Sequence, residues 1–324
     1  MKELPDLRLL LAAVLIFSTL LISAQTKDDV INTYNDGVAL ANTNVEKAIE
    51  KFNLAHELAL KVGVESDDIK NLVETQLPAL QIKYAAELYK AKNIKEAIPA
   101  YMLAAELAEK VGNAEIAAKA NEIIPKLHFS LGNELYKSEK YDSALICFDQ
   151  SLTYDSTYAK AYLSKGLIYK KQDNQEAMIA ALDQAIVFGK LANDEKTATT
   201  AGNVIRDYLL VTGNKAVKAG NFQEALPLLV KSSTYGEPKP EVFYLLALCH
   251  NKDSQWDEAI KAAKQGIDLE NESNEAKAKF YYELGNAYIG KGENASACTA
   301  FKNALYGNYL ESAKYQIETV LKCN

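Results

Sequence analysis

The sequence is poor in the residues that interrupt helices. Its 324 residues include only 15 glycines and 7 prolines, and no stretch rich in Gly, Pro or Ser marks a linker. Alanine, the best helix former, occurs 46 times. Glycine and proline are the poorest helix formers, so the composition favours an all-α chain. The length alone would suggest about two domains, but the composition marks no boundary between them.

Concentrated positive charge is also absent. Lys and Arg number 36 against 43 Asp and Glu, which gives a net charge of −7. Binding to the phosphates of nucleic acids requires clustered Lys and Arg side chains. We therefore expect no nucleic-acid partner.

Motifs for metal binding and catalysis are scarce. The three histidines, His56, His128 and His250, lie far apart, and no Cys-x-x-Cys occurs, so no metal site is predicted. The stretch Gly285–Lys291 has the glycine and lysine spacing of a phosphate-binding loop, but Gly292 follows where Ser or Thr is needed. No nucleophile–base pair emerges either. We expect no enzymatic activity, no cofactor and no small-molecule substrate.

The longest hydrophobic run lies at the N-terminus. Residues Leu9–Ile22 carry no charge, but a membrane-spanning helix needs about 20 residues. A run of this length followed by Ser23-Ala24 is typical of a secretory signal peptide. We predict a signal peptide over residues 1–24, a short segment over 25–30, and export to the periplasm or the cell exterior. The charges before the run cancel, so an uncleaved membrane anchor and a buried hydrophobic helix are the alternatives.

A repeated pattern of small and large residues follows. In one copy, Gly132 is followed after twelve residues by Ala144, and Phe148 comes four residues later. Small residues at the first two positions would let two antiparallel helices approach closely, and we expect the large residue to fill the gap between neighbouring hairpins. The second position of the seven copies is occupied by Ala48, Ala97, Ala144, Met178, Ala225, Ala259 and Ala297.

This pattern resembles the tetratricopeptide repeat family, whose unit is a helix–turn–helix of 34 residues. The last copy is the most similar, with Tyr281, Leu284, Gly285 and Tyr288 at signature positions. The resemblance covers residues 31–307 and implies an all-α, right-handed superhelical solenoid of about seven antiparallel helix hairpins. Residues 308–324 are predicted to form a C-terminal capping helix.

Three copies are longer than the family unit. The excess falls before the first helix of the second, third and fifth copies, where the sequence also has helical character. We expect extended or doubled first helices there, with Pro78 and Pro125 as kinks or restarts. The clearest turn of the array is predicted at residues 237–240, which read Glu-Pro-Lys-Pro.

Four cysteines remain, at positions 147, 249, 298 and 323. In an oxidising compartment Cys298 and Cys323 could join the last repeat to the cap. The alternative is that each cysteine serves as a small apolar residue in helix packing.

The resemblance also implies a binding surface. In this family the first helix of each hairpin lines the concave face, through positions three before the first small residue and one, four and five after it. Here these positions carry aromatic, aliphatic, Asn and Lys side chains, which suit an extended peptide or a helix. The predicted groove residues are Phe129, Asn133, Tyr136, Lys137, Leu163, Leu167, Lys170, Asn214, Lys218, Tyr244, Leu248, Tyr282 and Asn286.

Some members of the family clamp a C-terminal carboxylate with paired Lys and Asn. Asn133, Asn214 and Asn286 occupy the Asn position, but Phe129, Leu210 and Tyr282 stand where Lys is expected. A generic repeat consensus explains the Asn residues equally well.

The sequence therefore predicts a non-catalytic scaffold or adaptor of the cell envelope that binds a protein or peptide along the groove. The alternatives are a structural component that self-assembles into a homo-oligomer, and a repeat protein tethered to the membrane by residues 1–24.

Overall fold

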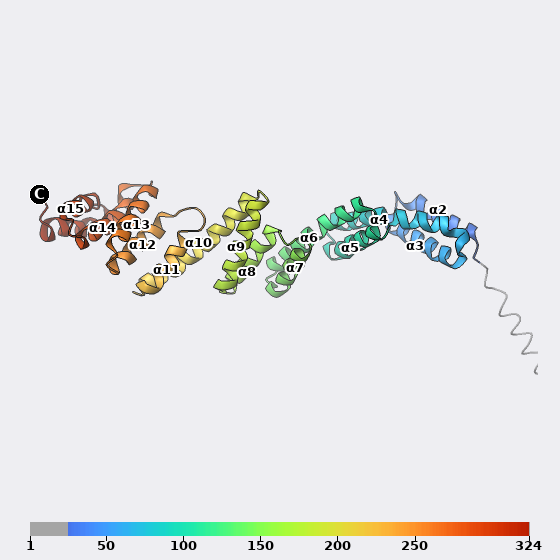
Figure 1. Ribbon diagram of the computed structural model, residues 1–324, viewed down its shortest axis with the longest axis horizontal. Helices are drawn as coiled ribbons and strands as arrows, with labels where there is room; N and C mark the ends of the chain where they lie inside the picture. Colours follow the sequence, from blue (N-terminus) through green and yellow to red (C-terminus); the bar gives the residue numbers. More distant parts are fainter. Residues whose placement is uncertain (1–24, 324) are drawn as a thin grey trace, which may run out of the picture. The chain divides into compact units, whose positions relative to one another are not determined.

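The computed structural model describes residues 25–323, and all their regular secondary structure is helical (Figure 1). The predicted signal peptide lies outside the described residues. The chain divides into two compact units, unit 1 up to Ser156 and unit 2 from Thr157. The sequence predicted one array without a boundary over this span. No helix in the described part is long and apolar enough to cross a bilayer.

Unit 1 consists of three helix hairpins in which each helix packs on the next. A short 3-10 turn, Val64–Ser66, connects the first two hairpins. The hairpins are α2 (Lys27–Leu40) with α3 (Val45–Val62), α4 (Asp67–Lys90) with α5 (Ile94–Lys110), and α6 (Ala114–Lys137) with α7 (Tyr141–Tyr154).

Unit 2 consists of four hairpins with the same sequential packing. They are α8 (Ala159–Lys171) with α9 (Gln175–Leu191), α10 (Glu195–Lys218) with α11 (Phe222–Ser232), α12 (Pro240–Lys252) with α13 (Trp256–Leu269), and α14 (Asn274–Gly290) with α15 (Asn294–Asn303). The predicted all-α architecture of antiparallel hairpins is confirmed.

Three first helices are extended, as predicted. Helices α4, α6 and α10 each contain 24 residues. Pro78 and Pro125 lie inside α4 and α6, so neither helix restarts at its proline. A proline removes one N–H donor from a helix. Both prolines are buried, and each helix continues past its proline.

A serine hydroxyl joins the second helix to the first in two of the long hairpins. Ser151 Oγ donates a hydrogen bond of 2.8 Å to the carbonyl oxygen of Pro125. Ser232 Oγ donates one of 2.9 Å to the carbonyl oxygen of Arg206. Both serines are completely buried. Each serine occupies the same repeat position, and each acceptor lies 26 residues earlier in the chain.

The small residue at the first repeat position sets how closely the two helices of a hairpin approach. A Cβ atom added to Gly132 would lie 2.6 Å from the ring of Phe148, and one added to Gly285 would lie 2.7 Å from the ring of Phe301. The large residue therefore packs against the glycine of its own hairpin, rather than only between neighbouring hairpins as we predicted. The reason is that sixteen residues of helix–turn–helix carry the chain around the turn and back to its starting level.

The turns between paired helices hold residues with a left-handed backbone. In six of the seven hairpins the turn contains a residue with positive φ, at Lys92, Glu139, Asp173, Gly220, Ser254 or Gly292. These residues reverse the chain within three positions and so end the first helix of each of these hairpins.

The C-terminal segment differs from the single capping helix that we predicted. It consists of a 3-10 turn, Gly307–Tyr309, a short helix α16 (Leu310–Tyr315), and a π-helical turn, Gln316–Val320. A disulfide bond joins Cys298 to Cys323, with 5.8 Å between the two Cα atoms. The irregular path has a physical reason, because the segment must seat Ala313 in the core and still return to α15.

Candidate binding surface

All the predicted groove residues lie on first helices, namely α6, α8, α10, α12 and α14. None of them is fully buried. The aromatic, aliphatic and Asn residues are half-buried, and Lys137, Lys170 and Lys218 are exposed. Those on α6 belong to unit 1 and the others to unit 2, so each unit presents a first-helix face of its own.

The first-helix face of unit 1 combines anchored rings with unpaired polar groups. The Phe129 ring lies 5.7 Å from that of Phe148, and the Tyr136 ring lies 5.8 Å from that of Tyr141. Neither Asn133 nor Lys137 forms a side-chain hydrogen bond with another described residue. The rings are fixed, and an amide and an ammonium group remain available.

Helices α8 and α10 present a similar set in unit 2. Leu163 packs against the core that α9 and α10 share. Asn214 is half-buried, and its side chain forms no hydrogen bond within residues 25–323. The exposed Lys218 lies one helical turn further along α10. The pair Asn214 and Lys218 thus repeats the pair Asn133 and Lys137.

The same face is different on α12 and α14, because a buried carboxylate engages the amides. Glu283 is only 5% exposed. Asn251 Nδ2 donates hydrogen bonds to the Glu283 carbonyl oxygen at 2.9 Å and to its Oε2 at 2.8 Å. Asn286 Nδ2 donates to the same Oε2 at 3.3 Å. Burial raises the pKa of Glu283, while the two amides and the charge of Lys252 act in the opposite direction.

No pattern in the repeat predicts the buried Glu283. The equivalent position, two residues before the first small residue, holds Asn35, Lys83, Ser130, Ser164, Val211 and Leu245 in the other copies. Because this position accepts charged, polar and apolar residues, a glutamate there does not by itself indicate a buried acid.

The C-terminal segment covers the predicted groove residues Tyr244 and Tyr282. The hydroxyl oxygens of Tyr244 and Tyr309 lie 3.1 Å apart, and the rings of Tyr282 and Tyr309 lie 5.3 Å apart. Lys279 Nζ lies 5.4 Å from the centre of the Tyr244 ring and forms an ion pair of 2.6 Å with Glu241. Burial is the main cause that raises the pKa of Tyr244. The sequence contains no pattern that predicts where Tyr309 lies.

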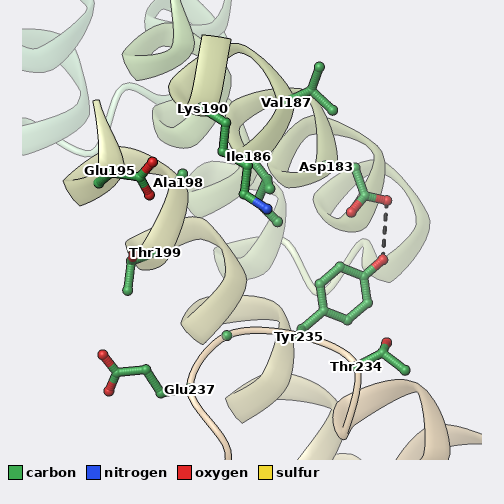
Figure 2. A pocket seen from close by; sticks show the side chains of 11 residues that line it. Asp183, Ile186, Val187, Lys190, Glu195, Ala198, Thr199, Thr234, Tyr235 and Glu237 are labelled. Atoms are coloured by element: carbon green, nitrogen blue, oxygen red, sulfur yellow. Dashed lines mark hydrogen bonds between the residues drawn. The ribbon is translucent and has the colours of Figure 1, made fainter. Parts of the chain in front are cut away.

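A pocket of about 510 Å³ lies elsewhere in unit 2, between α9, the start of α10 and the loop after α11 (Figure 2). Tyr235 from this loop donates a hydrogen bond of 3.3 Å to Asp183 of α9, which closes one side of the pocket. Burial and the hydrogen bond to Asp183 raise the pKa of Tyr235 to about 12. Lys190 and Glu195 place opposite charges on the same walls.

The loop beside this pocket is fastened by a buried arginine. Arg206 donates hydrogen bonds to Asn203 Oδ1 at 2.7 Å and to the Glu237 carbonyl oxygen. Its charge is paired with Asp207 at 2.8 Å. The predicted turn at residues 237–240 is therefore tied to α10, and the pocket follows from the extension of that helix. Its walls contain no nucleophile–base pair.

The histidines and the free cysteines are dispersed through the two units. His56 lies 2.8 Å from Glu74, and His128 stacks on Tyr154. Cys147 and Cys249 are buried thiols without a disulfide partner. Within the described residues no group of three His, Cys, Asp or Glu side chains could hold a metal ion.

Three family models, each described as tetratricopeptide repeat, match the chain. One matches residues 129–195 and 210–273, the second matches 278–306, and the third matches 83–110.

Similar solved structures include repeat proteins of the same description. The TPR protein YrrB, described as having an unusual peptide-binding site, is 21% identical over 58% of this chain and 89% of its own, with a TM-score of 0.33. The C-terminal part of a TPR repeat-containing protein from Cytophaga hutchinsonii is 15% identical over 72% of this chain and 98% of its own, with a TM-score of 0.36. MamA from Desulfovibrio magneticus is 18% identical over 59% of this chain and 96% of its own, with a TM-score of 0.31.

Proposed function

The chain is a tetratricopeptide repeat protein, and on that premise we propose that it is a non-catalytic scaffold that binds an extended protein segment along its first helices. Proteins built from this repeat generally act as protein–protein interaction scaffolds. The finer proposal concerns which side chains make the contact and what they recognise.

One observation carries this proposal, namely the recurrence of an unpaired amide beside an exposed ammonium group. Asn133 with Lys137 and Asn214 with Lys218 occupy the same two repeat positions in different units. An Asn side chain can both donate to and accept from a peptide backbone. Lys adds attraction for acidic groups, which favours an acidic partner segment.

The experiment is recovery of a crosslinked partner from the native cells, with single substitutions on the first helices. We expect Lys137→Glu and Asn214→Ala to reduce recovery several-fold. Lys231→Glu is the control, because Lys231 is exposed on the second helix α11. Equal recovery with all three variants would reject the first-helix surface as the binding site.

We also propose that the protein acts outside the cytoplasm, in the cell envelope. The N-terminal run of the sequence and the disulfide bond between Cys298 and Cys323 support this proposal, because disulfides persist in oxidising compartments. N-terminal sequencing of the protein from its host tests it. Gln25 as the first residue is the expected result, and Met1 would reject cleavage.

Self-assembly is a second candidate function, and exposed apolar side chains on second helices favour it. Ile146 is 60% exposed and Leu191 is 74% exposed. Light scattering over a series of concentrations separates the two functions. A constant monomer mass would remove this candidate, and a mass that rises with concentration would support it.

A further inference from the structure

The contact between Tyr309 and the first helices of the last two hairpins identifies a subsite. We propose that Tyr309 is an internal occupant of an aromatic-binding subsite formed by Tyr244 and Tyr282, and that the partner presents an aromatic side chain that displaces it. This inference rests on the proposed function, since it states what the partner segment offers at one end of the surface.

The two walls of the subsite are equivalent positions of successive repeats. Tyr244 lies three residues before Ala247, and Tyr282 lies three residues before Gly285. These are the positions that the family resemblance assigns to the groove. A side chain that lies across both therefore occupies the place of a bound segment.

The subsite is suited to a ring that carries a polar group. Tyr282 contributes its ring, which lies 5.3 Å from that of Tyr309 and is tilted against it. Tyr244 contributes a hydroxyl group 3.1 Å from that of Tyr309. Lys279 adds a cation beside the Tyr244 ring, held by Glu241. An aromatic pair of this kind adds only modest stability beyond burial, so a ligand aromatic ring can compete with Tyr309.

The covering segment is attached at both ends, which gives it an advantage over a free ligand. Gly307 packs against Glu275 of α14, and Cys323 is bonded to Cys298 of α15. Ala313 between them is completely buried. A tethered occupant acts at an effective concentration of about 1 mM or more. A partner must therefore offer contacts along the rest of the first-helix surface to displace Tyr309.

The experiment compares peptide binding to the mature chain, residues 25–324, with and without the internal occupant. The variants are Tyr309→Ala and the control Tyr315→Ala, whose side chain lies in the same segment but is 58% exposed. The probe is a phage library of random twelve-residue peptides. Selected peptides are then synthesised, and their affinities are measured by fluorescence anisotropy.

We expect peptides selected on Tyr309→Ala to bind that variant at least about tenfold more tightly than wild type or Tyr315→Ala. We expect them to contain an aromatic residue whose replacement by Ala removes the gain. Adding Tyr244→Ala to Tyr309→Ala should remove it as well. Equal affinity for wild type and Tyr309→Ala, or no effect of Tyr244→Ala, would overturn the inference.

A second variant tests whether Tyr309→Ala acts only by unfolding the C-terminal segment. Tyr309→Phe retains the ring but lacks the hydroxyl group that meets Tyr244, so a gain in peptide affinity smaller than that of Tyr309→Ala is expected. If all variants bind peptides that depend only on Asn214 and Lys218, the proposed function stands and the inference fails. If no variant and no wild-type protein retains any peptide, the proposed function itself fails.

Discussion

Unit 1 buries a histidine against a tyrosine ring, whereas unit 2 surrounds a buried glutamate with two amides. The His128 ring stacks on Tyr154, and an interaction with the Gln150 side chain opposes the effect of burial on its pKa. Glu283 accepts hydrogen bonds from Asn251 and Asn286. Both units are built from the same type of hairpin. The buried polar groups therefore come from individual copies of the repeat and are not part of its common pattern.

The first-helix faces of the two units also differ in whether their polar side chains are paired. In unit 1 the polar side chains Asn133 and Lys137 remain unpaired. In the last two hairpins of unit 2, the internal carboxylate binds Asn286, and Tyr309 covers Tyr244. On the first of these faces the polar side chains are unpaired, and on part of the second they are engaged by other residues of the chain. Five variants test this comparison.

The largest effect is expected at the disulfide bond, which only unit 2 contains. Replacing both Cys298 and Cys323 by Ser releases a loop of 25 residues, and we expect the cap to lose about 3 kcal/mol of stability. Hydrogen exchange of residues 307–323 measures this loss. Reductant should reproduce it in wild type and leave the double variant unchanged. Equal protection of these amides in both proteins would contradict the assignment.

A smaller effect is expected for Gly132→Ala in unit 1. The added Cβ would lie 2.6 Å from the Phe148 ring, and such overpacking costs about 1–3 kcal/mol. Circular dichroism during urea unfolding should show a lower midpoint. Trp256, the single tryptophan, lies in unit 2, and its fluorescence transition should not move.

Gly285→Ala is the matched variant in unit 2, with a Cβ 2.7 Å from the Phe301 ring. It should lower the urea midpoint of the transition that Trp256 fluorescence reports. If Gly132→Ala shifts the tryptophan signal as strongly as Gly285→Ala does, the division into two units carries no energetic meaning.

A still smaller effect is expected for Glu283→Gln, in the stabilising direction. Because burial raises the pKa of Glu283, its ionised form disfavours folding as the pH rises above the ordinary value of 4.5. Gln keeps an oxygen that can accept from Asn251 and Asn286 but carries no charge. Thermal melts at pH 4.5 and pH 7.5 should show a gain for the variant at the higher pH alone. If the variant is instead less stable than wild type at pH 7.5, the negative charge of Glu283 stabilises the fold through its hydrogen bonds with Asn251 and Asn286.

The smallest effect is expected at His128 in unit 1. Burial lowers its pKa below the ordinary 6.5, so the unfolded chain takes up a proton first as the pH falls. Unit 1 should therefore be fully stable above pH 6.5 and lose stability below it. His128→Phe retains a ring against Tyr154. The urea midpoint of its circular dichroism signal should change less between pH 7 and pH 5.5 than that of wild type. The control His250→Gln should behave as wild type does.

The hairpins could be predicted because their packing rule is local in the sequence. Gly132 and Phe148 lie sixteen residues apart, and the two helices that join them have a fixed rise, so the spacing encodes the pairing of these helices. We had expected the large residue to contact the neighbouring hairpin, although the same spacing brings it to the glycine of its own. The long helices α4, α6 and α10 could be predicted only in part, because excess residues with helical character can either extend the first helix or form a second one. The pairing of Cys298 with Cys323 was one of two readings that the sequence left open.

The covered subsite could not be predicted, because it depends on an irregular segment. Tyr309 reaches Tyr244 from 65 residues further along the chain, through a 3-10 turn without periodicity. The pocket of Figure 2 has a similar origin, since Arg206 holds a carbonyl group 31 residues away. Contacts of this kind follow from the path of a loop, and no residue spacing specifies that path.

The hydroxyl bonds of Ser151 and Ser232 have a consequence for the engineering of this chain. Each joins a second helix to the main chain of its long first helix at the same relative position. The third long hairpin has Ala104 there, which is equally buried but has no donor. The hairpins α6–α7 and α10–α11 therefore form a matched pair of modules. Exchanging them between their two sites should preserve this internal bond, whereas a graft of α5 in place of α7 or α11 would lose it.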